Sequence, residues 1–209
     1  MTMERLATGI PVLDRELDGG LPAGSVVVLK ADPSSQSELF LNTFTHVRET
    51  LYLTSIRTPD AVADALSASA VPTGDPTIEG IDGADPIGDT LDRLSSLPNG
   101  GTLIIDSIEP LEHVDPERYR SFLGELRSRV DEAGAIGVVH ALENGARSRN
   151  RVVSEQVADV VFDLRTTVTA TEVVNRLAVT KFRGGAALEE PVKLKLTDTV
   201  SVDTSRDIA

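Results

Sequence analysis

The chain has 209 residues, 33 of them acidic and 20 basic, so its net charge is −13 and its sequence pI is near 4.6. It has no cysteine, which excludes disulfides, thiol catalysis and cysteine-bound metals. No apolar run approaches the ~20 residues of a membrane span and no signal peptide is visible, so we expect one cytoplasmic domain over 1–209, with a core at about 5–200 and a tail at 201–209.

Short apolar runs rich in Val, Ile and Leu alternate with helical patterns through most of the chain. Such runs are typical of buried parallel strands. They lie at 25–30, 50–55, 101–107, 135–141 and 158–164, and the helical patterns lie at about 36–48, 59–70, 86–97, 116–133 and 149–157. This alternation predicts a right-handed, doubly wound parallel sheet.

Two parts of the chain depart from the alternation. Residues 71–89 are rich in Gly, Pro and Asp, which predicts a surface loop, with a short strand at 77–81. Residues 167–185 and 191–203 alternate with a period of two, which predicts antiparallel strands at one edge of the sheet. The predicted fold class is therefore α/β, a mostly parallel central sheet flanked by helices with antiparallel C-terminal strands.

Three motifs in a fixed order point to a family. The first is Thr8-Gly9-Ile10, Leu13-Asp14, Gly19-Gly20-Leu21-Pro22 and Gly24, the second is an apolar strand ending in Asp106-Ser107, and the third is the strand at 158–164 followed by Lys181-x-Arg183-Gly184. Over roughly residues 5–200 the chain resembles the KaiC-like and RadA-like ATPases of the RecA superfamily. The resemblance implies a RecA-like P-loop NTPase fold, with a phosphate loop after the strand at 25–30.

The residues at that loop lack the groups of the G-x-x-x-x-G-K-[ST] motif. In order they are Ala31, Asp32, Pro33, Ser34, Ser35, Gln36, Ser37 and Glu38. Ala31 and Gln36 replace the two glycines, Ser37 replaces the lysine that meets phosphate, and Glu38 replaces the hydroxyl that holds magnesium. We therefore predict a degenerate Walker A site with no bound ATP or magnesium and no catalytic residue.

The replacements form a pattern of their own. Ser35-x-x-Glu38 is typical of a capping box, in which the two side chains accept from each other's backbone N–H. Asp32 and Glu38 would also repel a triphosphate at short range. We expect the protein to supply its own anion, Glu38, at the start of this helix.

The resemblance singles out further positions. Ile56 and Arg57 fall where relatives place the acidic residues that activate water, which leaves Asp60 as the nearest carboxylate. Asp106 stands where relatives hold magnesium, although an Asp there also caps the following turn, the interpretation that we favour. His140 lies where relatives place a phosphate-sensing residue, and a hydrogen-bonded histidine at a strand end is the simpler interpretation.

Two groups of basic residues suggest contacts with other molecules. The resemblance implies that Lys181 and Arg183 reach a neighbouring subunit's γ-phosphate as a trans-acting finger; the alternative is a solvated pair on a hairpin. Arg147, Arg149 and Arg151 fall near a loop that contacts single-stranded DNA in recombinase relatives. We favour a solvated arm or ion-pair partner for them, because no aromatic residue lies among them to stack bases and the net charge repels nucleic acid.

These features favour a pseudo-ATPase with a regulatory or scaffolding role, which binds a protein partner such as an active paralogue or further copies of itself. Only four of the basic residues are lysines, and this acidic composition is typical of a salt-loving archaeon. One alternative is an ATP- and magnesium-binding ATPase with an unorthodox phosphate loop, acting in recombination, repair or signalling. The other is a DNA-binding accessory factor. The three histidines lie far apart in the sequence, so no metal site is expected.

Overall fold

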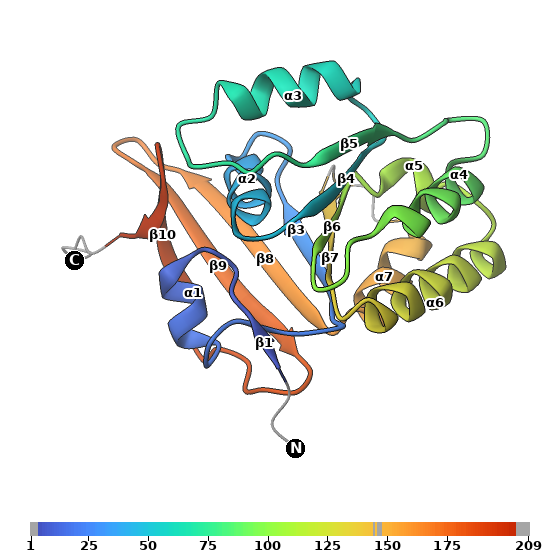
Figure 1. Ribbon diagram of the computed structural model, residues 1–209. Helices are drawn as coiled ribbons and strands as arrows, with labels where there is room; N and C mark the ends of the chain where they lie inside the picture. Colours follow the sequence, from blue (N-terminus) through green and yellow to red (C-terminus); the bar gives the residue numbers. More distant parts are fainter. Residues whose placement is uncertain (1–3, 144, 146–147, 204–209) are drawn as a thin grey trace.

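The computed structural model describes residues 4–143, 145 and 148–203, and its central feature is a sheet of nine strands in the order β11-β10-β9-β8-β3-β7-β6-β4-β5 (Figure 1). Its strands are β3 (Val26–Ala31), β4 (Thr50–Thr54), β5 (Thr77–Gly80), β6 (Thr102–Asp106), β7 (Ile136–Leu142), β8 (Val160–Val168), β9 (Val173–Phe182), β10 (Val192–Leu196) and β11 (Val200–Val202). From β8 to β5 all neighbours pair in parallel, and β9, β10 and β11 add antiparallel strands. The predicted fold class is confirmed.

Helices cover both faces of the sheet. On one face lie α1 (Pro11–Glu16), α2 (Glu38–Val47) and α3 (Pro59–Ser67); on the other lie α4 (Pro86–Arg93), the 3₁₀ turn η1 (Leu94–Ser96), α5 (Glu109–Glu112), α6 (Pro116–Glu132) and α7 (Arg149–Val157). Side chains alternate between these layers along each strand. In β3, for example, Val27 and Leu29 join the core under α2, whereas Val26 and Val28 join the core under α6.

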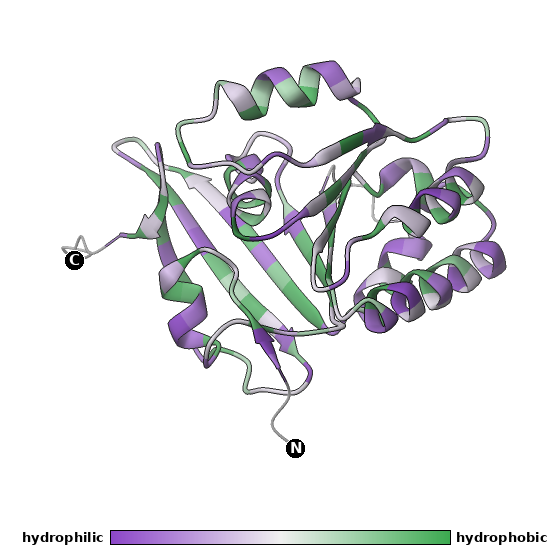
Figure 2. Ribbon diagram, in the orientation of Figure 1, coloured by the Kyte–Doolittle hydropathy of each residue, from purple (hydrophilic) through white to green (hydrophobic). Residues whose placement is uncertain are grey.

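Every residue of β3, β4 and β6 is buried. The hydropathy colouring agrees, because the central strands are mainly hydrophobic while α6 is hydrophilic on its outward face (Figure 2). Strands buried on both faces are typical of parallel sheets between helical layers. The carboxyl ends of β3, β4, β6, β7 and β8 consequently meet at one edge of the sheet, where α/β folds place ligands.

The five predicted parallel strands and the helices at 36–48, 59–70, 116–133 and 149–157 are present within a few residues of their predicted bounds. The pattern at 86–97 divides into α4 and η1, and the strand at 77–80 is the edge strand β5. Strand β11 ends at Val202, so the ordered sheet extends two residues into the predicted tail.

The short helices α1 and α5 and the two-stranded sheet of β1 (Arg5–Leu6) and β2 (Leu21–Pro22) were not predicted. Gly20 of the first motif lies against this small sheet. Gly20 has a φ of +116°, and a Cβ there would come within 2.3 Å of the Leu6 carbonyl oxygen, so only glycine fits. No helix among the described residues is long and apolar enough to cross a membrane.

Candidate functional site

The loop at the phosphate-loop position turns through contacts of its own. Asp32 follows the buried end of β3 and accepts hydrogen bonds from both the hydroxyl and the N–H of Ser34, which hold the pKa of its exposed carboxyl below the ordinary value. The Ser35 N–H donates to the Asp32 carbonyl oxygen at 2.9 Å. Pro33, Ser34 and Gln36 are exposed, whereas Ala31 and Ser37 are buried.

The capping box predicted for this loop is wrong. Helix α2 begins at Glu38, and Ser37 before it is already in the helical region, with φ −61° and ψ −25° and no capping hydrogen bond from its side chain. Among the described residues, the Ser35 hydroxyl is buried with no hydrogen-bond partner. The Glu38 carboxylate turns instead toward Arg57, whose Nη1 lies 3.2 Å from its Oε1.

Asp106, at the end of β6, is the centre of a buried network. Its Oδ2 accepts from the Tyr52 hydroxyl and from Arg57 Nη2, each at 2.7 Å, and its Oδ1 lies 2.7 Å from His140 Nδ1. Burial alone would raise the pKa of Asp106, but the hydrogen bonds and charges of His140, Tyr52 and Arg57 lower it well below its ordinary value. Capping of the next turn, the role we favoured for Asp106, is therefore wrong for its side chain.

His140 connects this network to the loop. Strands β6 and β7 pair in register so that Asp106 and His140 are neighbours, and β3 lies on the other side of β7. His140 is 2% exposed, and its Nε2 lies 3.1 Å from the Ser37 hydroxyl. Both ring nitrogens are thus hydrogen-bonded, as expected of a satisfied histidine.

Arg57 takes the place that a metal cation would need. It lies between Glu38 and Asp106, the residues at the two expected magnesium-binding positions. Burial lowers the pKa of Arg57, but Asp106, Tyr52 and Glu38 together raise it above its ordinary value. Ile56 points outward with 66% of its surface exposed, and Asp60 is exposed in the first turn of α3. No group of three or more His, Cys, Asp or Glu side chains suited to a metal occurs in the described part of the chain. The residues present do not fit a magnesium-nucleotide.

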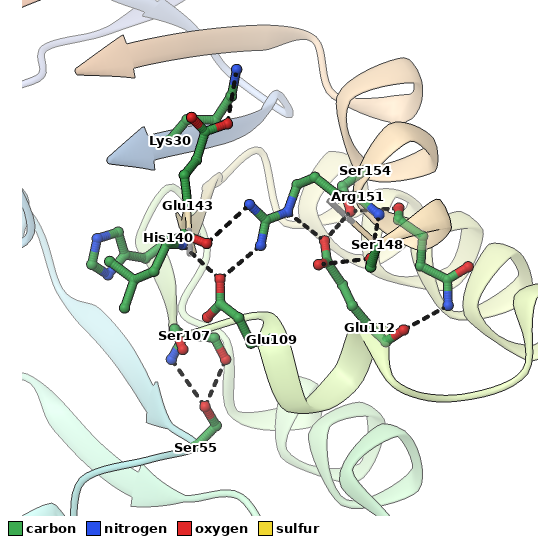
Figure 3. A network of polar contacts seen from close by, with 12 residues as sticks. Lys30, Ser55, Ser107, Glu109, Glu112, His140, Glu143, Ser148, Arg151 and Ser154 are labelled. Atoms are coloured by element: carbon green, nitrogen blue, oxygen red, sulfur yellow. Dashed lines mark hydrogen bonds and ion pairs between the residues drawn. The ribbon is translucent and has the colours of Figure 1, made fainter. Parts of the chain in front are cut away.

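A second polar cluster, centred on Arg151, lies beside the first (Figure 3). Arg151 Nε bonds Glu112 Oε1 and its Nη2 bonds Glu109 Oε1, both at 2.7 Å, while Nη1 lies 3.3 Å from the Leu142 carbonyl oxygen. The Arg151 and Glu112 side chains are only 5% and 3% exposed. The predicted contact of Arg151 with nucleic acid or a partner is therefore wrong, because its guanidinium is buried and paired with Glu109 and Glu112.

The other two arginines of that group differ from Arg151. Arg149 is exposed at the first residue of α7, and Arg147 lies outside the described residues. Sequence analysis missed Glu109 and Glu112, whose spacing of three places both on one side of the single turn α5.

A cavity of about 740 Å³ opens beside the Arg151 cluster, at the carboxyl ends of β3, β7 and β8. Lys30, at one wall, is 7% exposed and pairs with Glu143 at 3.3 Å, Asp163 at 3.4 Å and Glu155 at 3.8 Å. Lys30 is thus paired within the protein, whereas Glu109 Oε2, also on the cavity lining, is buried with no hydrogen-bond partner among the described residues.

Lys181 and Arg183 both contact the end of α7. Lys181 Nζ donates to the carbonyl oxygens of Glu155 and Gln156, each at 2.8 Å, and burial lowers its pKa. Arg183 Nη2 donates to Gln156 at 2.9 Å and its Nη1 to Val157 at 3.0 Å. These carbonyls lack partners within the helix, so the two cations cap its C-terminus. Neither side chain is simply solvated, although Arg183 is half exposed.

Comparison with known proteins gives a family and a fold. The profile of a family of unknown function, DUF7125, matches residues 5–209. No curated protein matches the chain. Among solved structures, the KaiC-like protein PH0186 from the hyperthermophilic archaeon Pyrococcus horikoshii OT3 aligns with a TM-score of 0.77 and 17% identity, over 96% of this chain and 99% of that one. At this identity the likeness establishes a KaiC-like fold alone.

Proposed function

This chain belongs to the DUF7125 family and has a KaiC-like fold, and from that premise we propose that it is a pseudo-ATPase that binds a protein partner instead of hydrolysing ATP. One observation carries the proposal. The Arg57 guanidinium lies 3.2 Å from Glu38 and 2.7 Å from Asp106, where a nucleotide's magnesium ion would need free oxygen ligands. Displacing it would leave a half-buried cation and a buried carboxylate without their partners, which is strongly unfavourable.

The phosphate side of the site supports the same proposal. Ser37 stands in place of the lysine, and its hydroxyl is engaged with His140. The nearest lysine in the sequence is Lys30, which three carboxylates surround. The carboxylate of Asp32 adds negative charge beside the loop. A triphosphate would therefore meet carboxylates without the motif's lysine, and the nearby cation Arg57 is already paired with Glu38 and Asp106.

The test is calorimetric titration of the full chain with magnesium-ATP. It belongs in molar salt, because the net charge of −13 supports a salt-loving host. We expect no dissociation constant tighter than about 1 mM, which corresponds to roughly −4 kcal/mol of binding free energy. A melting curve with and without nucleotide provides an independent measurement. Micromolar binding would overturn the proposal and favour an ATPase with an unorthodox loop.

The proposal also states that the chain binds a protein partner. A KaiC-like fold without a nucleotide can still present its surface to another copy or to an active paralogue. Sedimentation of the purified chain alone, and mixed with such a paralogue, separates these two partners. A strictly monomeric chain that leaves the paralogue's sedimentation and ATPase rate unchanged would contradict the scaffolding role.

A further inference from the structure

Three buried side chains in the loop network form a connected set that nucleotide binding does not explain. Ser37 precedes α2, His140 lies on β7 and Asp106 ends β6. The Ser37 hydroxyl is 3.1 Å from His140 Nε2, and His140 Nδ1 is 2.7 Å from Asp106 Oδ1. A serine, a histidine and a carboxylate in this order are the arrangement by which hydrolases activate a serine nucleophile.

The direction of each hydrogen bond follows from the groups around Asp106. Its Oδ2 accepts from the Tyr52 hydroxyl and pairs with Arg57 Nη2, so the carboxylate acts as an acceptor. His140 then donates from Nδ1 to Oδ1, and in the tautomer that this bond selects Nε2 accepts from the Ser37 hydroxyl. This is the direction needed for His140 to remove the Ser37 proton. Tyr52 and Arg57 hold the other carboxylate oxygen and fix the orientation of Asp106.

The backbone adds a second feature of such sites. Ser37 lies between β3 and α2, at the residue before the helix, and its φ of −61° and ψ of −25° are unstrained, unlike the backbone of a nucleophile elbow. Among the described residues, the N–H of Glu38 has no hydrogen-bond acceptor. The N–H of the residue after the nucleophile is one that stabilises the oxyanion of a tetrahedral intermediate.

We propose that Ser37 is an activated nucleophile and that this chain hydrolyses small uncharged esters. Ser37 Oγ attacks the carbonyl carbon as its proton passes to His140 Nε2. The intermediate then releases the alcohol, which takes that proton, and leaves an ester on Ser37. Water, deprotonated by His140, attacks this ester and returns the proton to Ser37 as the acid departs. The net reaction is ester plus water giving acid plus alcohol.

The surroundings define the class of substrate. The carboxylates of Asp32 and Glu38 flank the loop and disfavour anions, so the acyl group is neutral. Ser37 is only 2% exposed, but Gln36 and Glu38 on either side of it are exposed. Because Ser37 Oγ is buried, a substrate reaches it only after the surrounding chain moves, which restricts it to small esters and makes the reaction slow.

The experiment uses the full chain and a small fluorophosphonate, which adds to activated serines with loss of fluoride. The absence of cysteine leaves no thiol to react with the probe. We expect one addition, located at Ser37 by mass spectrometry, and its absence in Ser37→Ala. His140→Gln should slow it at least about 100-fold, the usual contribution of a general base. Ser34→Ala, in the exposed part of the same loop, is the matched control and should react like the parent chain.

A folding control keeps the outcome decisive if His140→Gln does not fold. The parent chain should react when folded and lose its reactivity in urea, because activation depends on the folded geometry. Hydrolysis of p-nitrophenyl acetate should be lost with Ser37→Ala. No addition to the folded chain, addition at another serine, or equal rates in folded and unfolded chains would each overturn the inference. Nucleotide titration reports separately on the pseudo-ATPase proposal, so either can fail alone.

Discussion

The loop before α2 and the hairpin beside α7 are the two regions where the resemblance predicts contacts with phosphate, and they compare with the expected motifs in opposite ways. In the loop the residue types differ from the phosphate-loop motif, and Ser37 joins Asp106 and His140 in one buried network. In the hairpin Lys181 and Arg183 match the expected motif, yet both cap α7 of their own chain. The presence or absence of a motif residue therefore does not decide what its side chain contacts.

The largest predicted effect concerns the α7 region. Arg151→Ala should lower the free energy of unfolding by about 3–5 kcal/mol, because it leaves Glu109 and Glu112 without their shared cation in a buried site. Denaturant unfolding in molar salt measures it. Arg149→Ala, on the same turn but exposed, is the matched control and should change stability by less than about 0.5 kcal/mol. Equal effects of the two variants would mean that the buried cluster does not anchor α7.

The next largest effect on the free energy of unfolding is predicted for the network beside the loop. Asp106→Asn should cost about 1.5–3 kcal/mol near neutral pH, since the charged acceptor of Tyr52, Arg57 and His140 is lost. The folded-state pKa of Asp106 is lowered, so its contribution is present above the ordinary value of 3.8 and is lost as the pH falls toward the lowered one.

Urea unfolding near neutral pH and at about pH 3 measures this dependence, because the gap between parent and variant should narrow in acid. Other carboxylates titrate in both chains, so the difference isolates Asp106. A gap that stays constant or widens would show that the ionised carboxylate is not what stabilises the network.

These two predictions also mark where sequence reasoning stops. The hydrophobic pattern predicted the strands and most helices, because burial of an element determines which of its residues are apolar. The pattern did not predict that Arg151 is buried, since arginine is rarely buried unless it is paired, and its partners lie 39 and 42 residues away in the sequence. The capping box failed for a related reason. Ser35-x-x-Glu38 is a local pattern, but Arg57 on a neighbouring loop attracts Glu38.

A smaller effect is predicted for the hairpin. The double substitution Lys181→Ala and Arg183→Ala removes two cations from the C-terminus of α7, each worth about 0.3–1 kcal/mol, so unfolding should become about 0.6–2 kcal/mol easier. Lys195→Ala, at an exposed position on β10, is the control. Hydrogen exchange in α7 should rise in the double variant alone.

The same variant tests the trans-acting finger, which remains a prediction. In a mixed assay with an active paralogue, loss of the partner's ATPase stimulation while association persists would support it. Unchanged turnover with faster exchange in α7 would restrict the pair to capping.

The smallest predicted effect distinguishes the two roles considered for Glu38. As an ion-pair partner it is 54% exposed and faces an arginine that is 29% exposed, so Glu38→Ala should cost only about 0.2–1 kcal/mol. Loss of a capping box would cost about 0.5–2 kcal/mol, and these ranges overlap.

The coupling free energy between two substitutions distinguishes the ion pair from the capping box. In double-mutant cycles Glu38→Ala should couple with Arg57→Ala, and the coupling should weaken as salt rises, because exposed charges are screened. It should be additive with Ser35→Ala, whose hydroxyl has no partner in the loop. The reverse result, coupling to Ser35 and additivity with Arg57, would restore the capping box and remove the cation from the proposed magnesium position.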